Sequence, residues 1–131
     1  IRRADGLILA SPGYHGSVSG LVKNAIDYVE DLRDDSRIYL SGRAVGLIAC
    51  AEGVQALGAT LAALRAITHS LRGWPTPYAA LIQGGSRPFA SDGACQDPAV
   101  ARALGVVAQE VMEFVALRRA AGAAPPGAAG A

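Results

Sequence analysis

Residues 11–17, SPGYHGS, combine residue types that suit a flat ring system with a polar edge. Gly13 and Gly16 allow a ligand to approach the backbone closely and tolerate positive φ. Tyr14 offers a flat apolar face with a polar tip. Successive backbone N–H groups in such a loop can donate to an anion or an electron-rich heterocycle. A stretch of this composition is more often a plain turn, so a ligand role depends on its place in the fold.

Other residues that could do chemistry form no recognisable constellation. His15 lies in the same loop and is able to touch a ligand, but no carboxylate or cysteine accompanies it, and His69 falls on a polar helix face. Two cysteines, Cys50 and Cys95, indicate neither a disulfide framework nor a metal site and favour free thiols in a cytoplasmic protein. No catalytic triad order, Walker loop or zinc spacing is present, so we predict no metal site and name no catalytic acid or base.

The composition is that of one globular domain. The 131 residues are 51% apolar and 18% charged, and the net charge is +1. Such a weak charge gives no argument for nucleic acid or an anionic membrane surface. No apolar run approaches the ~20 residues that a membrane span needs, and the run near the N-terminus is too short for a signal peptide.

Strands and helices alternate along the sequence. Apolar runs at residues 6–10 and 43–50 predict strands that are covered on both faces, and residues 77–83 predict a third. Helical periodicity begins at Val18, Val54 and Pro98, with Ser17 or Ser19 capping the first helix and Asp97 the last. The predicted inner stripes are Val18, Val22, Ala25, Val29 and Leu32, widened by Leu21 and Ile26; Val54, Leu57, Leu61, Leu64, Ile67 or Thr68, and Leu71; and Val100, Leu104, Val107, Val111, and Phe114 or Val115.

This order predicts an α/β fold with a parallel sheet and helices on both faces. Ligands bind outside the carboxyl ends of the strands in such sheets. Residues 11–17 and 50–58 both follow strands, so they are expected at one edge, where they would form a single site.

Residues 4–30 resemble the NADPH-dependent FMN reductase family of flavodoxin-like flavoproteins. Members carry a strand ending in Thr/Ser-Pro, then x-Tyr-Asn/His-Gly-Ser, then a helix opening Gly-x-x-Lys-Asn-Ala-x-Asp. The matching residues are Ser11-Pro12, Tyr14-His15-Gly16-Ser17, Gly20, Lys23-Asn24-Ala25 and Asp27. The similarity continues through GRAVGLIACAEGVQALG and FASDGACQDPAVARAL and covers residues 4–117.

The resemblance implies where FMN would bind. In the family, the Pro-x-Tyr loop packs against the isoalloxazine ring, and the loop after the next strand approaches the pyrimidine edge of that ring. A carboxylate at that edge disfavours the anionic reduced flavin unless it points away, and Glu52 stands in the second loop. Carried over, the first contact implies Pro12, Gly13, Tyr14, His15, Gly16 and Ser17, and the second implies Ala51, Glu52 and Gly53.

The family pattern begins with a strand, a phosphate loop, a helix and a second strand, which this sequence does not contain. We therefore expect residues 1–118 to be the C-terminal part of a flavodoxin-like FMN reductase domain. It would be a three-layer sandwich that lacks the first two strands and the phosphate loop, which a larger polypeptide or another chain supplies. Residues 119–131, rich in Ala, Gly and Pro and without periodicity, are expected to be a disordered tail.

The implied activity is reduction of FMN by NADPH or NADH, with hydride passing from nicotinamide to flavin and electrons passing on to a second acceptor. Candidate acceptors are free flavin, a quinone, a nitro or azo compound, or a metal oxyanion. The resemblance also implies a homodimer or homotetramer. Two alternatives stay open. A flavodoxin-like electron-transfer module is disfavoured by the charge of +1 and by aromatic residues at 5%. A flavin-free structural or interaction subunit is favoured by the missing phosphate loop.

Overall fold

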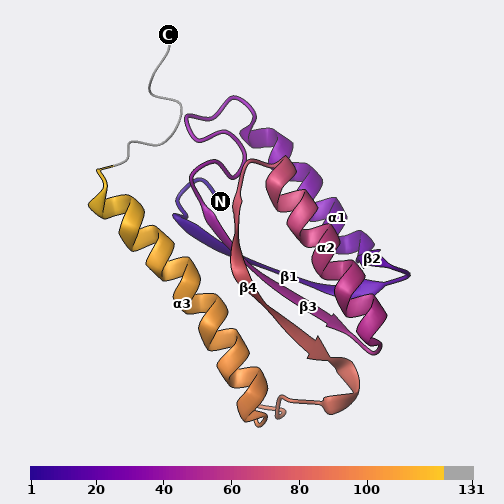
Figure 1. Ribbon diagram of the computed structural model, residues 1–131. Helices are drawn as coiled ribbons and strands as arrows, with labels where there is room; N and C mark the ends of the chain where they lie inside the picture. The colour runs from indigo at the N-terminus through magenta and orange to yellow at the C-terminus, as the bar shows by residue number, and fades with distance from the viewer. Residues whose placement is uncertain (123–131) are drawn as a thin grey trace.

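The computed structural model describes residues 1–122 and has three layers, with a sheet between helices (Figure 1). Helices α1 and α2 cover one face of the sheet and α3 lies across the other. The elements in chain order are β1 (Gly6–Tyr14), β2 (Ser17–Val18), α1 (Gly20–Asp27), the 3₁₀ turn η1 (Tyr28–Leu32), β3 (Ala44–Ala51), α2 (Val54–Ser70), β4 (Trp74–Gln83), the 3₁₀ turn η2 (Gly84–Ser86) and α3 (Pro98–Ala120).

The sheet has the order β2-β1-β3-β4. Strands β1, β3 and β4 are parallel, and the two-residue β2 runs antiparallel to the end of β1. The predicted parallel α/β sandwich is therefore confirmed. All three carboxyl ends meet at one edge, where Pro12 of β1 pairs with Cys50 of β3, and Ala51 pairs with Gln83 of β4.

The predicted start of α3 at Pro98 is confirmed, whereas α1 begins at Gly20 and not at Val18, which lies in β2. The Ser19 hydroxyl accepts from the Val22 N–H at 3.1 Å, so Ser19 rather than Ser17 caps α1. The Asp97 carboxylate accepts from Ala99 N–H at 2.8 Å, and Pro98 opens α3. Helix α3 continues to Ala120, two residues beyond the predicted domain boundary, and the predicted tail from residue 123 onward lies outside the described residues.

The main core lies between the sheet and α2, where Val45 and Leu47 of β3 pack with Leu57 and Leu64 of α2. On the opposite face two glycines let α3 approach the sheet. A methyl group on Gly6 would stand 2.5 Å from Val111, and one on Gly46 would stand 2.5 Å from Val107. A side chain at either position would therefore push α3 away from the sheet.

Parts of the predicted inner stripes were wrong. Leu21 is 81% exposed, Val54 is 76% exposed, and Ala25 is also exposed. Helix α1 gives way to η1 after Asp27, so that only Val29 and Leu32 of this segment are buried. Val54 is the first residue of α2 and lies at the edge where the sheet ends.

Strand β1 is longer and less covered than predicted. It extends four residues past Ala10, to Tyr14, and its Ile8 side chain is 53% exposed. Among the described residues, the stretch from Gly6 to Pro12 pairs with β3 on one side only. Within the predicted run of residues 6–10, Ile8 and Ala10 are exposed, so the expectation of cover on both faces is wrong for these two residues.

A buried arginine joins the amino ends of the strands. Arg43 is fully buried and donates to the backbone carbonyls of Ala4 and Tyr39 at 3.0 Å each, and to those of Arg37 and Arg2 at 3.4 and 3.3 Å. Burial lowers the pKa of Arg43. The carbonyl oxygens compensate the buried charge, and in doing so they fix the chain that enters β1.

Candidate functional site

The predicted loop at residues 11–17 is a β-hairpin. Strands β1 and β2 pair Gly13 with Val18 and Tyr14 with Ser17, which leaves His15 and Gly16 as a two-residue turn. Their φ values are +51° and +88°, the positive pair that such a tight hairpin turn requires. The loop is therefore more ordered than its composition suggested, and it carries Tyr14, 61% exposed, on its strand end.

Gly13 joins this hairpin to the second predicted loop. A methyl group there would collide with the Thr60 hydroxyl of α2 and would stand 3.2 Å from the Ala56 carbonyl oxygen and 3.3 Å from Ala51 Cβ. Gly13 is thus needed for packing against α2, not for the approach of a ligand. Gly16 differs, because a methyl group there would meet no atom of residues 1–122 within 4 Å. The open space that a ligand could occupy therefore begins at Gly16.

Two buried hydroxyl groups that were not among the predicted site residues hold the hairpin in place. Buried Ser11 accepts from the Ser19 N–H at 3.0 Å and donates to the Pro12 carbonyl at 2.8 Å. Thr60, also buried, donates to the Ser17 carbonyl at 3.4 Å. Ser11 could have been suspected from its place at a strand end before proline, whereas the role of Thr60 depends on packing that the sequence does not display.

The second predicted loop, Ala51 to Gly53, connects β3 to α2. Ala51 is buried, whereas Glu52 and Gly53 are exposed. Gly53 is the N-cap of α2 and offers no side-chain acceptor, so the first N–H groups of that helix have no capping side chain from it. The Glu52 carboxylate lies against Gly84 and Gly85, beyond the end of β4. Since β3 lies between β1 and β4, this carboxylate leans away from the hairpin.

The structure brings the nine predicted site residues to one edge of the sheet. Pro12 and Gly13 lie beside Cys50 and Ala51, while the turn residues and Glu52 to Gly53 flank them. Burial raises the pKa of the Cys50 thiol, which keeps it protonated at neutral pH. Within residues 1–122, no three histidine, cysteine or acidic side chains gather in a way that could hold a metal ion.

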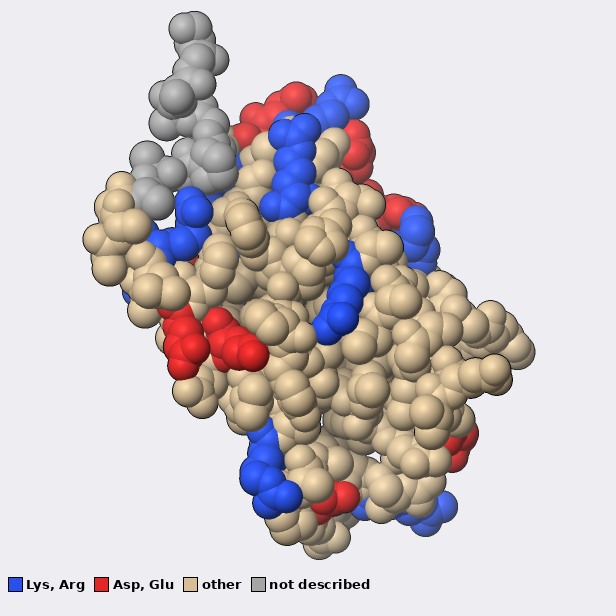
Figure 2. All heavy atoms as spheres, viewed as in Figure 1, with Lys and Arg blue, Asp and Glu red and all other residues tan. Residues whose placement is uncertain are grey.

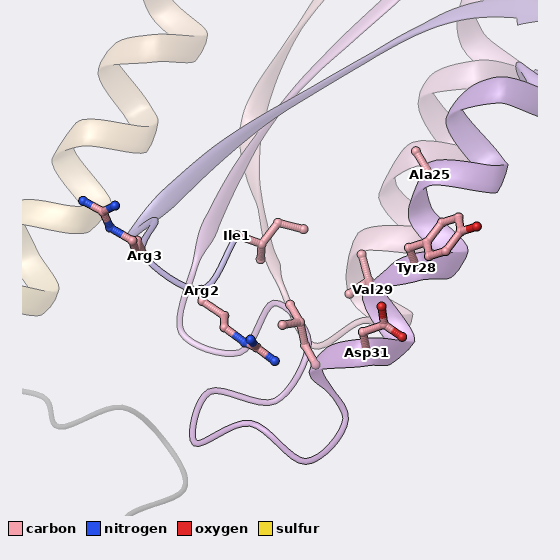
Figure 3. Close-up of a pocket in the computed structure, with 8 residues that line it drawn as sticks. Ile1, Arg2, Arg3, Ala25, Tyr28, Val29 and Asp31 are labelled. Carbon is pink, nitrogen blue, oxygen red and sulfur yellow. The ribbon is translucent and has the colours of Figure 1, made fainter.

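A separate hollow of about 480 Å³ lies at the opposite end of β1. Figure 3 shows Ile1 and Arg2 on one side of it, with Ala25, Tyr28 and Asp31 on the other. None of the predicted site residues lines it. This hollow is open and lies between the chain entering β1 and helix α1 with η1, so it is no part of the candidate site.

On the face that Figure 2 shows, the described residues form no large patch of one charge. Basic and acidic side chains of the described residues are interspersed on the face that Figure 2 shows. No helix within residues 1–122 has the length and apolar character to cross a bilayer.

Comparisons with known proteins identify the family to which this chain belongs. The chain matches the family described as NADPH-dependent FMN reductase over residues 1–86. It is 38% identical over 77 residues to an FMN-dependent NADPH-azoreductase of Staphylococcus haemolyticus, and 40% identical over 74 residues to one of Staphylococcus aureus. These matches cover 59% and 56% of this chain but only 37% and 36% of the relatives. The chain therefore spans little more than a third of the curated relatives it matches.

Solved structures share the fold. The flavoenzyme FerB of Paracoccus denitrificans, an NAD(P)H:acceptor oxidoreductase, superposes with a TM-score of 0.67 at 26% identity, covering 88% of this chain and 63% of that one. An oxidoreductase of Corynebacterium diphtheriae superposes with a TM-score of 0.60 at 22% identity. The match covers 88% of this chain and 56% of the Corynebacterium chain. With the family match extending over the hairpin, both predicted loops and the whole of β4, this chain belongs to the NADPH-dependent FMN reductase family.

Proposed function

We propose that this protein is an NAD(P)H-dependent oxidoreductase that binds FMN at the carboxyl edge of its sheet. The observation that carries the proposal is the packing of Gly13 against Ala51, which places the hairpin and the β3–α2 loop side by side. The family membership and the names of the relatives support the choice of FMN and NADPH. When bound, FMN supplies the two-electron chemistry that links a nicotinamide to a second acceptor.

The residues present fit the ring system of a flavin. Pro12 and Tyr14 offer apolar surface, and the turn at Gly16 leaves open space beside it. The first N–H groups of α2, without a side-chain cap from Gly53, can donate to an electron-rich edge. The chain would bind and orient the ring through these groups, and no side chain is assigned as a proton donor.

The acceptor that deserves the first test is an azo compound, because curated relatives are azoreductases by name. Free flavin, a quinone, a nitro compound and a metal oxyanion remain acceptors to compare with it. We also propose that the protein works in the cytoplasm, where its two cysteines would stay reduced, and that it forms a homodimer or homotetramer. The exposed small residues Gly58, Ala62 and Ala66 on α2 would permit close packing of a second copy.

We further propose that the sheet is completed beside β1 by a strand and a helix, from the same polypeptide or another chain. The two edges of the described sheet differ in a way that supports this. The β4 edge is protected, because Pro75 and Pro77 lack N–H donors and the Tyr78 N–H is bonded to Glu110 at 2.9 Å. The β1 edge is apolar, and none of the described residues protects it in this way between Gly6 and Ala10. The greater length of the relatives is consistent with such a segment.

The function is tested on the complete polypeptide, by which we mean the chain together with the strand and helix proposed to complete the sheet. The first experiment is its purification. We expect a yellow protein, or one that takes up FMN on titration, and NADPH oxidation that requires FMN together with an acceptor. A protein that binds no FMN would contradict the proposal and leave the flavin-free structural subunit. A protein that binds FMN but does not oxidise NADPH or NADH would instead be an electron-transfer module.

A further inference from the structure

The end of β4 is tied to the loop before α2 through Gln83. The Gln83 side-chain amide donates to the backbone carbonyl of Glu52 at 2.8 Å. Its own backbone carbonyl accepts from the Ser86 hydroxyl at 2.7 Å, which fixes the η2 turn. Gln83 also pairs with Ala51 in the register of β3 and β4. One residue therefore connects the carboxyl ends of two strands and the loops that follow both.

The Glu52 carboxylate lies at the same junction. A methyl group on Gly84 would stand 2.6 Å from Glu52 Oε1, and one on Gly85 would stand 3.4 Å from Oε2. The absence of side chains at these glycines leaves room for the carboxylate on the β4 side of β3. With the Glu52 carbonyl held by Gln83, both the backbone and the side chain of Glu52 are directed to β4, away from the hairpin.

We propose that Gln83 is a positioning residue for the flavin site, which holds the Glu52 carboxylate away from the ring and leaves the N-terminus of α2 to face it. The proposal rests on the proposed function. The edge of a flavin gains negative charge when the flavin is reduced, so a carboxylate beside it would weaken binding of the reduced form. N–H groups at a helix N-terminus favour negative charge. Gln83 would thus keep the negative charge of Glu52 away from the flavin edge and leave the N-terminus of α2 facing that edge.

The test uses Gln83→Ala in the complete polypeptide, with affinity measured for oxidised and for reduced FMN. Loss of one hydrogen bond corresponds to a ~2- to 10-fold change in an equilibrium constant. We expect Gln83→Ala to weaken binding of reduced FMN ~3- to 10-fold more than binding of oxidised FMN. The matched control is Gln109→Ala, because Gln109 of α3 also donates its amide to an exposed acceptor, Glu113 at 2.7 Å. Gln109→Ala should leave both affinities unchanged.

A second substitution separates charge from shape. Glu52→Gln keeps the carbonyl that Gln83 binds and removes the charge. If Gln83 acts by directing the carboxylate, Gln83→Ala should no longer discriminate between oxidised and reduced FMN in the Glu52→Gln background. Persistence of the full discrimination there would overturn the proposed role of the charge.

Hydrogen–deuterium exchange of residues 51–56 provides a readout that needs no flavin. We expect faster exchange in Gln83→Ala and wild-type exchange in Gln109→Ala. Equal exchange and equal FMN affinities in wild type and Gln83→Ala would overturn the role of Gln83 while the proposed function stands. Absence of FMN binding by the wild type would instead overturn the proposed function, and with it the role toward flavin, whatever the exchange shows.

Discussion

Gly13 is the residue on which the geometry of the site depends most. A side chain there would meet Thr60, Ala56 and Ala51, so Gly13→Ala must push β1 and α2 apart. We expect a loss of about 1–3 kcal/mol in the free energy of unfolding, measured by urea titration. Gly58→Ala is the control, since a methyl group on Gly58 meets nothing within 4 Å and alanine favours a helix. An equal effect of both substitutions would show that Gly13 is not tightly packed.

Arg43 should matter as much for stability at the other end of the strands. Arg43→Ala would leave four backbone carbonyls without their donor, and we expect a loss of about 3 kcal/mol or more in the free energy of unfolding. The exposed Arg65 makes a single bond to the Pro77 carbonyl at 2.9 Å, and Arg65→Ala should cost ~1 kcal/mol or less. Similar losses for the two variants would contradict the anchoring role of Arg43.

At the scale of elements, one carboxylate ties three segments together. Asp5, just before β1, pairs with Arg37 at 3.0 Å and with Arg119 of α3 at 2.6 Å. Hydrogen bonds from Arg119 and then Arg37 lower the pKa of Asp5 below its ordinary value of 3.8. The unfolded chain therefore binds this proton more readily. The stabilisation is complete above pH 3.8 and is lost as the pH falls through the lowered pKa of the folded state.

Thermal unfolding across pH checks this sign. Asp5→Asn should unfold at a lower temperature than the wild type near pH 6, and the difference should shrink as the pH falls below 3.8. Asp34→Asn is the control, because the Asp34 side chain is 93% exposed and lies 3.9 Å from Arg33. A difference for Asp5→Asn that stays constant down to low pH would rule out the ion pairs as its cause.

The elements themselves were predictable from the sequence to different degrees. The apolar run of β3 and the cap of α3 at Asp97 have local signals, and both were found. The hairpin was missed because its turn depends on positive φ at His15, a conformation that is uncommon for residues other than glycine. Thr60 and Gln83 could not be found from the sequence, because their roles arise from contacts between elements that are distant along the chain.

At the scale of the whole molecule, the unpaired edge of β1 leads to a prediction about Ile8→Lys. The substitution should improve the behaviour of residues 1–131 alone and should destabilise the complete polypeptide. Ile8→Lys places a charge on the exposed strand of residues 1–131 alone, and we expect less aggregated mass in light scattering. In the complete polypeptide, where the proposed strand and helix would cover Ile8, the same substitution should lower the free energy of unfolding by about 2 kcal/mol or more.

Leu117→Lys is the matched control for this prediction. Leu117 on α3 is 70% exposed, and a lysine there should leave the stability of both forms nearly unchanged. A complete polypeptide that tolerates Ile8→Lys as well as Leu117→Lys would contradict the proposal that a further segment covers β1.

The central claim, that FMN binds against the hairpin, is tested most directly by a pair of glycine substitutions. Gly16 and Gly93 have φ values of +88° and +87°, and a methyl group on either would meet nothing within 4 Å. Valine therefore takes an unfavourable positive φ at both positions, and only Gly16 lies in the candidate site. FMN is titrated into the complete polypeptide carrying Gly16→Val or Gly93→Val, with circular dichroism to verify folding. The account predicts FMN affinity ~10-fold or more weaker for Gly16→Val, equivalent to ~1.4 kcal/mol, and wild-type affinity for Gly93→Val. Wild-type affinity in both variants would contradict it.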